Sequence, residues 1–567
     1  MKKIFYISLF VIVLSQLTSC TAGFEEMNVN PTTPVGTEIP YLFTNVISSL
    51  RVNGNEQLYV YNEIFYPESE LGALIAEGWS NYTIGIAVMW SSYYSSLANV
   101  RDIEQRLDDY CSEQNDSEIC DNVKAMLLIL TAYKTFKVTD VFGDIPFSQA
   151  GKVWLETNNE EYRKPKFDSQ EDIYKSLLDS LVWARDFMTA NAATTTLGND
   201  FYPITSADVL FYGSADKWAR FANSLILRHG LRMYDADPDF AKPLLVEAYN
   251  KPVIDDYYPG YGGVCLWPNT LGITFDHHWA FREHKNLRMG ETVFSRLSTT
   301  DSTDGSGIFD YRTYVFFDTN HPIKSDTLCP QGRWVPYPQI RTSSTPAEGG
   351  SPYGYRDNNY YFKSPLCLFS SFNYYLIRDD AYVPEILMTA AEIGFVKAEI
   401  LARGIVGEAN SNDVGLAFQN AMESSFLFWI HLPGYVNRWT YYYTPLEEAL
   451  ASMDIYSLCT KFSSDVFNHY LEQNGWNLFT NEEYVKLIVE QRWLNSFLQP
   501  WEAWILARRT LGSDYETPTT TGHSKLITYR LPYPSSENEY NHENYQEQVA
   551  KMAPLGDSKS TKVWWMN

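Results

Sequence analysis

Histidine and acidic side chains are the residues with which this chain could carry out catalysis or bind a metal. The 567 residues contain no GxSxG, HExxH or GxGxxG motif and no phosphate-binding P-loop. His277, His278 and His284 are close in sequence, but adjacent side chains point in different directions on a strand or a helix. We therefore expect no metal site, no cofactor and no catalytic set of residues.

Three glutamates show a regular spacing. Glu385, Glu392 and Glu399 recur every seven residues, which would place them near one face of a helix spanning 384–402. A pair of carboxylates on one face could act as acid and base, but ion pairs with Arg residues between packed helices explain the spacing better. A secreted hydrolase remains an alternative, because two catalytic carboxylates could be hidden among 69 acidic residues.

Aromatic side chains carry the strongest indication of binding. The chain has 16 Trp, 41 Tyr and 31 Phe residues, and 16% of it is aromatic. Sugar rings stack their C–H faces on Trp and Tyr, while their hydroxyls need planar Asn, Asp, Gln or Arg partners. Peptides also favour aromatic clefts. Trp90 and Trp218 lie on helical stripes, so we assign these two to the core.

Charge excludes nucleic acid as a ligand. The formal net charge is -25, and it becomes -27 without residues 1–19, which contain Lys2 and Lys3. So acidic a surface repels phosphate backbones, and no basic patch interleaved with aromatic residues offsets it. A neutral ligand is expected instead.

Residues 1–19 have the organisation of a signal peptide. A short basic region precedes the apolar stretch 4–14, which is too short to span a bilayer. Residues 17–20, Leu-Thr-Ser-Cys, resemble the bacterial lipobox, in which cleavage occurs before a cysteine that is then acylated. We expect Cys20 to carry a lipid anchor, and 20–35 to be a polar tether.

The elements that would position a binding site are mostly helices. Residues 36–567 show no clear linker and are predicted to form one domain. An irregular insert with turn clusters and short strands is expected over about 251–383, and the tail is expected to be irregular from 515. Helical periodicity and capping signals predict helices over 90–107, 122–138, 170–189, 216–234, 238–249, 384–402, 413–428, 481–498 and 500–512.

Two cysteines flank a short polar loop. Cys111 and Cys120 are nine residues apart, and an exported protein can oxidise such a pair. A disulfide and two buried thiols both fit the sequence.

Several segments, in order, resemble the SusD/RagB-like outer-membrane lipoproteins of Bacteroidota. Each is a loose match, and the ordered set is specific. Besides the lipobox, the similar segments are Asn28–Pro31, Val141–Ala150, Lys217–Arg232, Ala390–Glu399, Arg530–Glu537 and Lys562–Trp565.

This resemblance implies a fold and a function. The fold would be mostly α, with tetratricopeptide-like helix pairs packed as a superhelical scaffold below an irregular ligand-binding face. The protein would bind a nutrient at the cell surface, a glycan or alternatively a peptide. It would deliver that nutrient to a SusC/RagA-like TonB-dependent barrel in the outer membrane.

The resemblance also implies where the ligand binds, although only by region. In the family, contacts come from the segment before the first long helix and from the central irregular region. For each such aromatic residue, packing in the core or in a loop is the alternative. The candidate residues are Trp79, Asn81, Tyr82, Trp267, Trp279, Arg282, Tyr353, Tyr355, Tyr360 and Tyr361.

Overall fold

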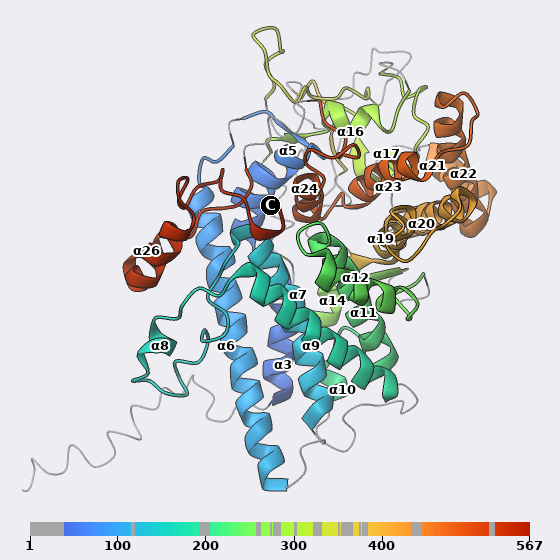
Figure 1. Cartoon of the computed structure of the whole chain (residues 1–567). Coiled ribbons are helices and arrows are strands. Elements are labelled where there is room, and N and C mark those ends of the chain that lie inside the picture. Colours follow the sequence, from blue (N-terminus) through green and yellow to red (C-terminus); the bar gives the residue numbers. More distant parts are fainter. Residues whose placement is uncertain are drawn as a thin grey trace, which may run out of the picture.

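Helices dominate the computed structural model of the chain (Figure 1). The short helices α5 (Tyr66–Ser69), α16 (Glu291–Ser295) and α17 (Thr313–Phe316) lie at one end of the long helices of the first half (Figure 1). The structure describes residues 39–76, 78–114, 120–191, 204–256, 262–272, 275, 285–299, 303–320, 332–349, 352, 367–373, 376, 384–432, 445–520 and 528–566.

Long helices pack in succession through the first half of the chain. α6 packs on α7, α7 on α9, α9 on α11 and α11 on α12, as expected for a scaffold of helix pairs. The bounds are α3 (Ile39–Ser48), α4 (Gly54–Glu56), the π-helix η1 (Gln57–Phe65), α5 (Tyr66–Ser69), α6 (Tyr82–Gln114), α7 (Asp121–Phe142), α8 (Glu160–Arg163), α9 (Gln170–Ala190), α10 (Ile204–Ala207), α11 (Ala215–Met233) and α12 (Pro238–Tyr249).

The helices of the second half form a further packed group. α19 packs on α20 and α23, and α20 also packs on α22 and α23. The bounds are α14 (Pro268–Leu271), α16 (Glu291–Ser295), α17 (Thr313–Phe316), α19 (Ala390–Ala402), α20 (Ser411–His431), α21 (Pro445–Ser452), α22 (Ile455–Gln473), α23 (Asn481–Asn495), α24 (Pro500–Arg509), α25 (Ser535–Tyr540), α26 (His542–Lys551) and the 3-10 turn η6 (Trp564–Met566).

Three two-stranded antiparallel sheets contain all the strands of the described residues. β1 (Ala73–Leu74) pairs with β3 (Leu287–Arg288), β2 (Gly263–Leu266) with β6 (Glu385–Thr389), and β4 (Phe317–Asp318) with β5 (Ser371–Phe372). The described parts of 251–383 thus consist of short elements, as predicted for the insert.

Local capping explains where several helices begin. The Asp237 carboxylate accepts a hydrogen bond from the backbone N–H of Phe240, with Pro238 at the first helical position of α12. Thr480 and Glu483 form a reciprocal capping box at α23. The cap of α23 is therefore Thr480, and Asn481, where the predicted helix begins, is the first helical residue.

The predicted helix over 384–402 was wrong in its first part. Residues 385–389 form strand β6, and only Ala390 onward is helical. Thr389 ends the strand and caps the helix, since its hydroxyl accepts a hydrogen bond from the N–H of Glu392. Glu385 therefore does not share a helix face with Glu392 and Glu399.

The prediction of an irregular tail was also wrong, because α25 and α26 lie within it.

Two hydrophobic clusters form most of the core. The first packs the helices from α3 to α12 together with parts of α19, α24 and the C-terminus, and the second fills the space around α19 to α24 and the insert. Trp218 is fully buried and Trp90 is 5% exposed, which confirms that both belong to the core. His229 is also buried and stacks on Phe136 at 3.8 Å.

A network of buried ion pairs joins helices from both halves of the chain. Glu392 on α19 accepts two hydrogen bonds from Arg228 on α11. Glu502 on α24 pairs with Arg232 at 2.6 Å and with Arg228 at 3.5 Å. Glu399 accepts two hydrogen bonds of 2.8 Å from Arg509. The expected Arg partners of Glu392 and Glu399 are thereby confirmed.

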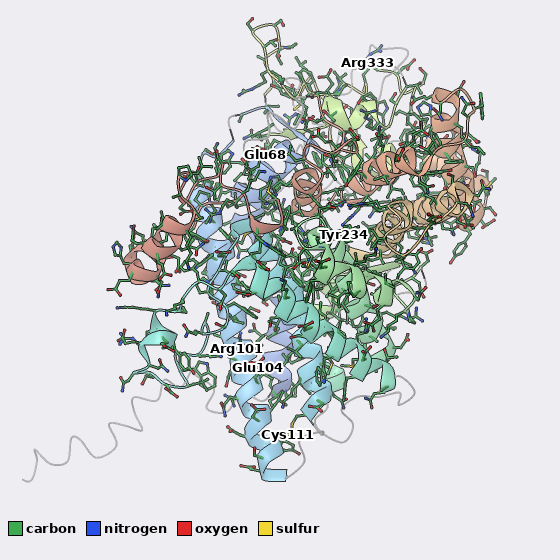
Figure 2. The ribbon with its side chains drawn as sticks, in the orientation of Figure 1. Glu68, Arg101, Glu104, Cys111, Tyr234 and Arg333 are labelled. Carbon is green, nitrogen blue, oxygen red and sulfur yellow. A yellow bond between two sulfur atoms is a disulfide. The ribbon has the colours of Figure 1, made fainter. Side chains whose placement is uncertain are left out.

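A disulfide closes the tip of the hairpin between α6 and α7. Cys111 and Cys120 are bonded, with their Cα atoms 6.4 Å apart. Cys111 lies at the end of α6 that is far from α5 (Figures 1 and 2). Of the two readings of this pair, the structure shows the disulfide.

Among the described residues, no helix combines the length and apolarity needed to cross a bilayer.

Candidate functional site

The segment before α6 is held in place by a buried carboxylate on the π-helix η1. Glu63 accepts hydrogen bonds of 2.9 Å from both the backbone N–H and the hydroxyl of Ser80. A β-carbon at Gly78 would lie 2.6 Å from the carbonyl oxygen of Glu63, so only glycine fits at this close approach. π-helical turns are rare and recur at functional sites. Here the π-helix fixes the loop that carries Trp79.

Trp79 adopts a backbone conformation that a bulky residue rarely takes. Its φ is +67°, in the left-handed region. Such strain persists where surrounding contacts impose it, and it clusters at ligand-binding sites. The hydrogen bonds of Ser80 to Glu63 supply the constraint. The loop is thus built to present one indole ring in a fixed direction.

Trp79 and Tyr82 form an aromatic pair at the start of α6. Their ring centroids are 5.0 Å apart at an interplanar angle of 65°, an edge-to-face arrangement. Both side chains are half-buried against the first core cluster. The ammonium of Lys559 lies 4.7 Å from the centre of the Trp79 ring, so a residue from the end of the chain completes the pair.

A half-buried acid, Glu68, lies next to this cation. Burial raises the pKa of Glu68 to about 7, although a hydrogen bond from Thr528 and the charge of Lys559 both oppose the shift. The Thr528 hydroxyl donates to the Glu68 carboxylate at 2.7 Å. Figure 2 places Glu68 toward the end of the long helices opposite Cys111. The aromatic pair beside these side chains can stack on a ligand.

The structure brings together two of the predicted ligand residues that it describes, Trp79 and Tyr82. Asn81 lies between them and is exposed, and its carbonyl accepts a hydrogen bond from the N–H of Ile84. Trp267 is half-buried against the second core cluster at the start of α14. The histidines at 277, 278 and 284 and the lipobox with Cys20 fall outside the described residues. So do the remaining predicted ligand residues, which are Trp279, Arg282, Tyr353, Tyr355, Tyr360 and Tyr361.

Sequence reasoning missed Glu63 and Lys559. Neither has a motif around it, and each acts through a contact with a segment distant in sequence. Of the two, only Glu63 had a local indication, as the one charged residue in the stretch 57–67. Within the described part of the chain, no three His, Cys, Asp or Glu side chains gather closely enough to hold a metal ion.

Two family matches cover most of the chain. Residues 31–264 match the family described as "Starch-binding associating with outer membrane", and residues 363–566 match "Susd and RagB outer membrane lipoprotein". The chain belongs to the SusD/RagB family. It is therefore an outer-membrane, nutrient-binding lipoprotein and not an enzyme, because members of this family are binding proteins.

Several solved structures share this fold over nearly the whole chain. A chitin-binding protein has a TM-score of 0.65 at 18% identity, with 94% of this chain and 100% of the other covered. A SusD/RagB family protein from Bacteroides thetaiotaomicron has a TM-score of 0.63 at 19% identity, covering 94% and 99%. A SusD homologue from Bacteroides uniformis has 0.60 at 19%, covering 93% and 99%.

These likenesses confirm the predicted SusD-like, mostly helical fold. No curated protein matches the sequence. At identities below 20%, the solved structures carry information about fold and not about the ligand of this chain.

Proposed function

We propose that this SusD-like lipoprotein captures a neutral glycan at the cell surface and passes it to a TonB-dependent barrel. The observation that supports this most is the aromatic pair of Trp79 and Tyr82, held on a strained loop by Glu63. Sugar rings stack on indole and phenol faces, and a fixed pair loses little conformational entropy on binding.

The charge of the protein supports a neutral ligand. With a formal charge of -25 over the full chain, long-range repulsion lowers the encounter rate with polyanions such as sulfated or uronic-acid glycans. Stacking is only weakly screened by salt, whereas ion-pair recognition weakens as ionic strength rises. Binding of the cognate glycan should therefore change little between low and physiological salt.

A binding panel tests this proposal. The mature protein would be titrated calorimetrically with chito-, malto-, xylo- and manno-oligosaccharides, and with short peptides as the second ligand class. Binding of one oligosaccharide series, and of no peptide, is the expected outcome. Binding of peptides alone would replace the glycan by a peptide, and no binding across the panel would refute both.

Trp79→Ala should weaken binding of the glycan identified by the panel. Removing a central aromatic anchor costs about 1–3 kcal/mol of binding free energy, equivalent to roughly a 5- to 150-fold rise in Kd. Trp183→Ala is a matched control, because Trp183 is a tryptophan on α9, away from the candidate site, and is 42% exposed. Equal affinities for wild type and a folded Trp79→Ala protein would move the site elsewhere.

The lipid anchor is proposed at Cys20. Cys20→Ala removes the thiol to which the lipid would be attached, so the variant should leave the membrane fraction. The measurement is fractionation of outer membranes followed by immunoblotting, with protease added to intact cells to test surface exposure. Retention of the variant in the outer membrane, together with protection from protease, would contradict the proposal.

The barrel partner is proposed from family membership. Purification of the lipoprotein from outer membranes in a mild detergent at low salt should recover a second protein of the size of a TonB-dependent barrel. Recovery of the lipoprotein alone under these conditions would argue against a stable complex.

A further inference from the structure

A pocket lies at the ends of four helices in the second half of the chain. It has a volume of about 960 Å³ and is lined where α19 and α24 end and where α20 and α23 begin. α19, α20 and α23 pack side by side (Figure 1), and their ends leave this space open. Its lining residues include neither the segment around Trp79 nor Glu63, Glu68 or Lys559.

One wall of the pocket is rigid. The Arg403 guanidinium lies 5.7 Å from the centre of the Tyr515 ring and 5.2 Å from that of Tyr234. Arg403 is also paired with Asp235 and with Glu399. Its position is therefore fixed from several sides, and the Tyr515 ring, half-buried in the wall, is fixed with it.

The loop that carries Tyr515 is held by its own hydrogen bonds. The Ser513 hydroxyl donates to the carbonyl of Thr510 at 2.7 Å, and the backbone N–H of Tyr515 donates to the Ser513 hydroxyl at 3.3 Å. The N–H of Gly512 donates to the carboxylate of Glu516 at 2.5 Å. The aromatic ring is thus presented before any ligand arrives, as at Trp79.

Four charged side chains around the pocket are available to a ligand. Within the described residues, they form no ion pair and no side-chain hydrogen bond with a neighbour. They are exposed and offer hydrogen-bond acceptors and one donor to a ligand; the four are Glu408, Glu482, Asp514 and Lys486.

We infer that this pocket is a second binding site for a neutral oligosaccharide, distinct from the aromatic pair at Trp79. Its volume is within the range of about 300–1,000 Å³ typical of small-molecule sites. A sugar ring would stack on Tyr515, and the carboxylates would accept hydrogen bonds from hydroxyl groups. Anionic ligands are disfavoured because the three carboxylates of Glu408, Glu482 and Asp514 outnumber the one ammonium of Lys486. This inference rests on the proposed function, because it assumes the same class of ligand, a neutral glycan.

A second site on one chain has a consequence for polymers. A glycan long enough to reach both sites binds the second one intramolecularly, at a high effective concentration. Long chains should then bind more tightly than short oligosaccharides of the same sugar, without any new contact.

Calorimetry on the mature full-length chain tests the inference, with chitohexaose and maltoheptaose as probes. We expect two binding sites per chain for at least one probe. Trp79→Ala should leave one site, and adding Tyr515→Ala should remove it or weaken it at least tenfold. Tyr456→Ala is the control, since Tyr456 is an exposed tyrosine on α22 outside the pocket. Asp514→Asn, which leaves the ring and the loop in place, should weaken the second site at least threefold.

The outcomes separate this inference from the proposed function. A single site per chain that Trp79→Ala weakens and Tyr515→Ala leaves unchanged would overturn the second site while supporting the first. A wild-type protein that binds neither probe would overturn the second site for these neutral glycans. Binding of peptides alone, or failure across the full panel of glycans and peptides, would overturn the proposed function.

Discussion

Glu502→Gln should lower the free energy of unfolding by about 3–5 kcal/mol, the cost of removing one partner from a buried ion pair. Glu502 is 3% exposed. Burial alone would raise the pKa of its carboxyl, but Arg232 and Arg228 outweigh burial and hold that pKa below its usual value. The amide cannot balance these two cations, which remain buried. Urea unfolding followed by circular dichroism measures the loss.

The control for this substitution is Glu539→Gln. Glu539 is exposed on α25 and forms no ion pair in the described part of the chain, so its amide variant should remain within about 0.5 kcal/mol of wild type. A similar small effect for Glu502→Gln would mean that the ion pairs from Glu502 on α24 to Arg228 and Arg232 on α11 do not stabilise the fold.

Helix positions could be predicted because each scaffold helix buries a stripe of its own residues. Trp218, Leu225 and Met233 lie on such a stripe of α11 and are all buried. Short helices in the tail could not be predicted in this way. α25 has no buried residue and α26 buries only Gln548, so neither leaves an apolar pattern in the sequence.

Helix α22 was not predicted although its sequence carried the pattern. Leu458, Phe462, Val466 and Tyr470 recur every four residues and all are buried. The strand at 385–389 shows the opposite case. Its residues 386–389 are all buried, and a short buried apolar run does not distinguish a strand from a helix.

Only part of the candidate site could be predicted from the sequence. Trp79 and Tyr82 were predicted from family resemblance, and they form an aromatic pair. The cation beside them comes from Lys559, and that contact depends on the C-terminal segment folding back. The same segment places the indole N–H of Trp565 at 2.8 Å from the Asp140 carboxylate on α7. Contacts of this range follow from tertiary packing, which no local pattern encodes.

The displaced Glu385 gives the second large prediction, a pH-dependent stability. Its carboxylate accepts a hydrogen bond of 3.1 Å from the backbone N–H of Val52, so it joins β6 to the segment before α4. Burial raises the pKa of Glu385 to about 7; Lys137, the Val52 hydrogen bond and Arg51 oppose the rise, and Glu56 adds to it. The folded protein therefore keeps a proton that the unfolded chain releases near pH 4.5.

The sign of the effect follows from this difference in bound protons. Between about pH 4.5 and pH 7 the folded state binds more protons than the unfolded state, so stability falls as pH rises through this window and then levels off. Glu385→Gln keeps an oxygen acceptor for Val52 and has no proton to lose. At about 1.4 kcal/mol per unit of pKa, the variant should gain roughly 3 kcal/mol relative to wild type between pH 4.5 and pH 8.

Urea unfolding of both proteins at several pH values measures this gain. Glu539→Gln, on the exposed face of α25, should show no pH-dependent difference from wild type. Glu68 has a pKa raised to the same value of about 7, mainly by burial, but it is present in both proteins and cancels from the comparison. Curves for Glu385→Gln and wild type that run parallel from pH 4.5 to pH 8 would show that the pKa of Glu385 is the same in the folded and the unfolded protein. The link between β6 and the helical scaffold would then be an ordinary ionic hydrogen bond, and the proton would have no part in it.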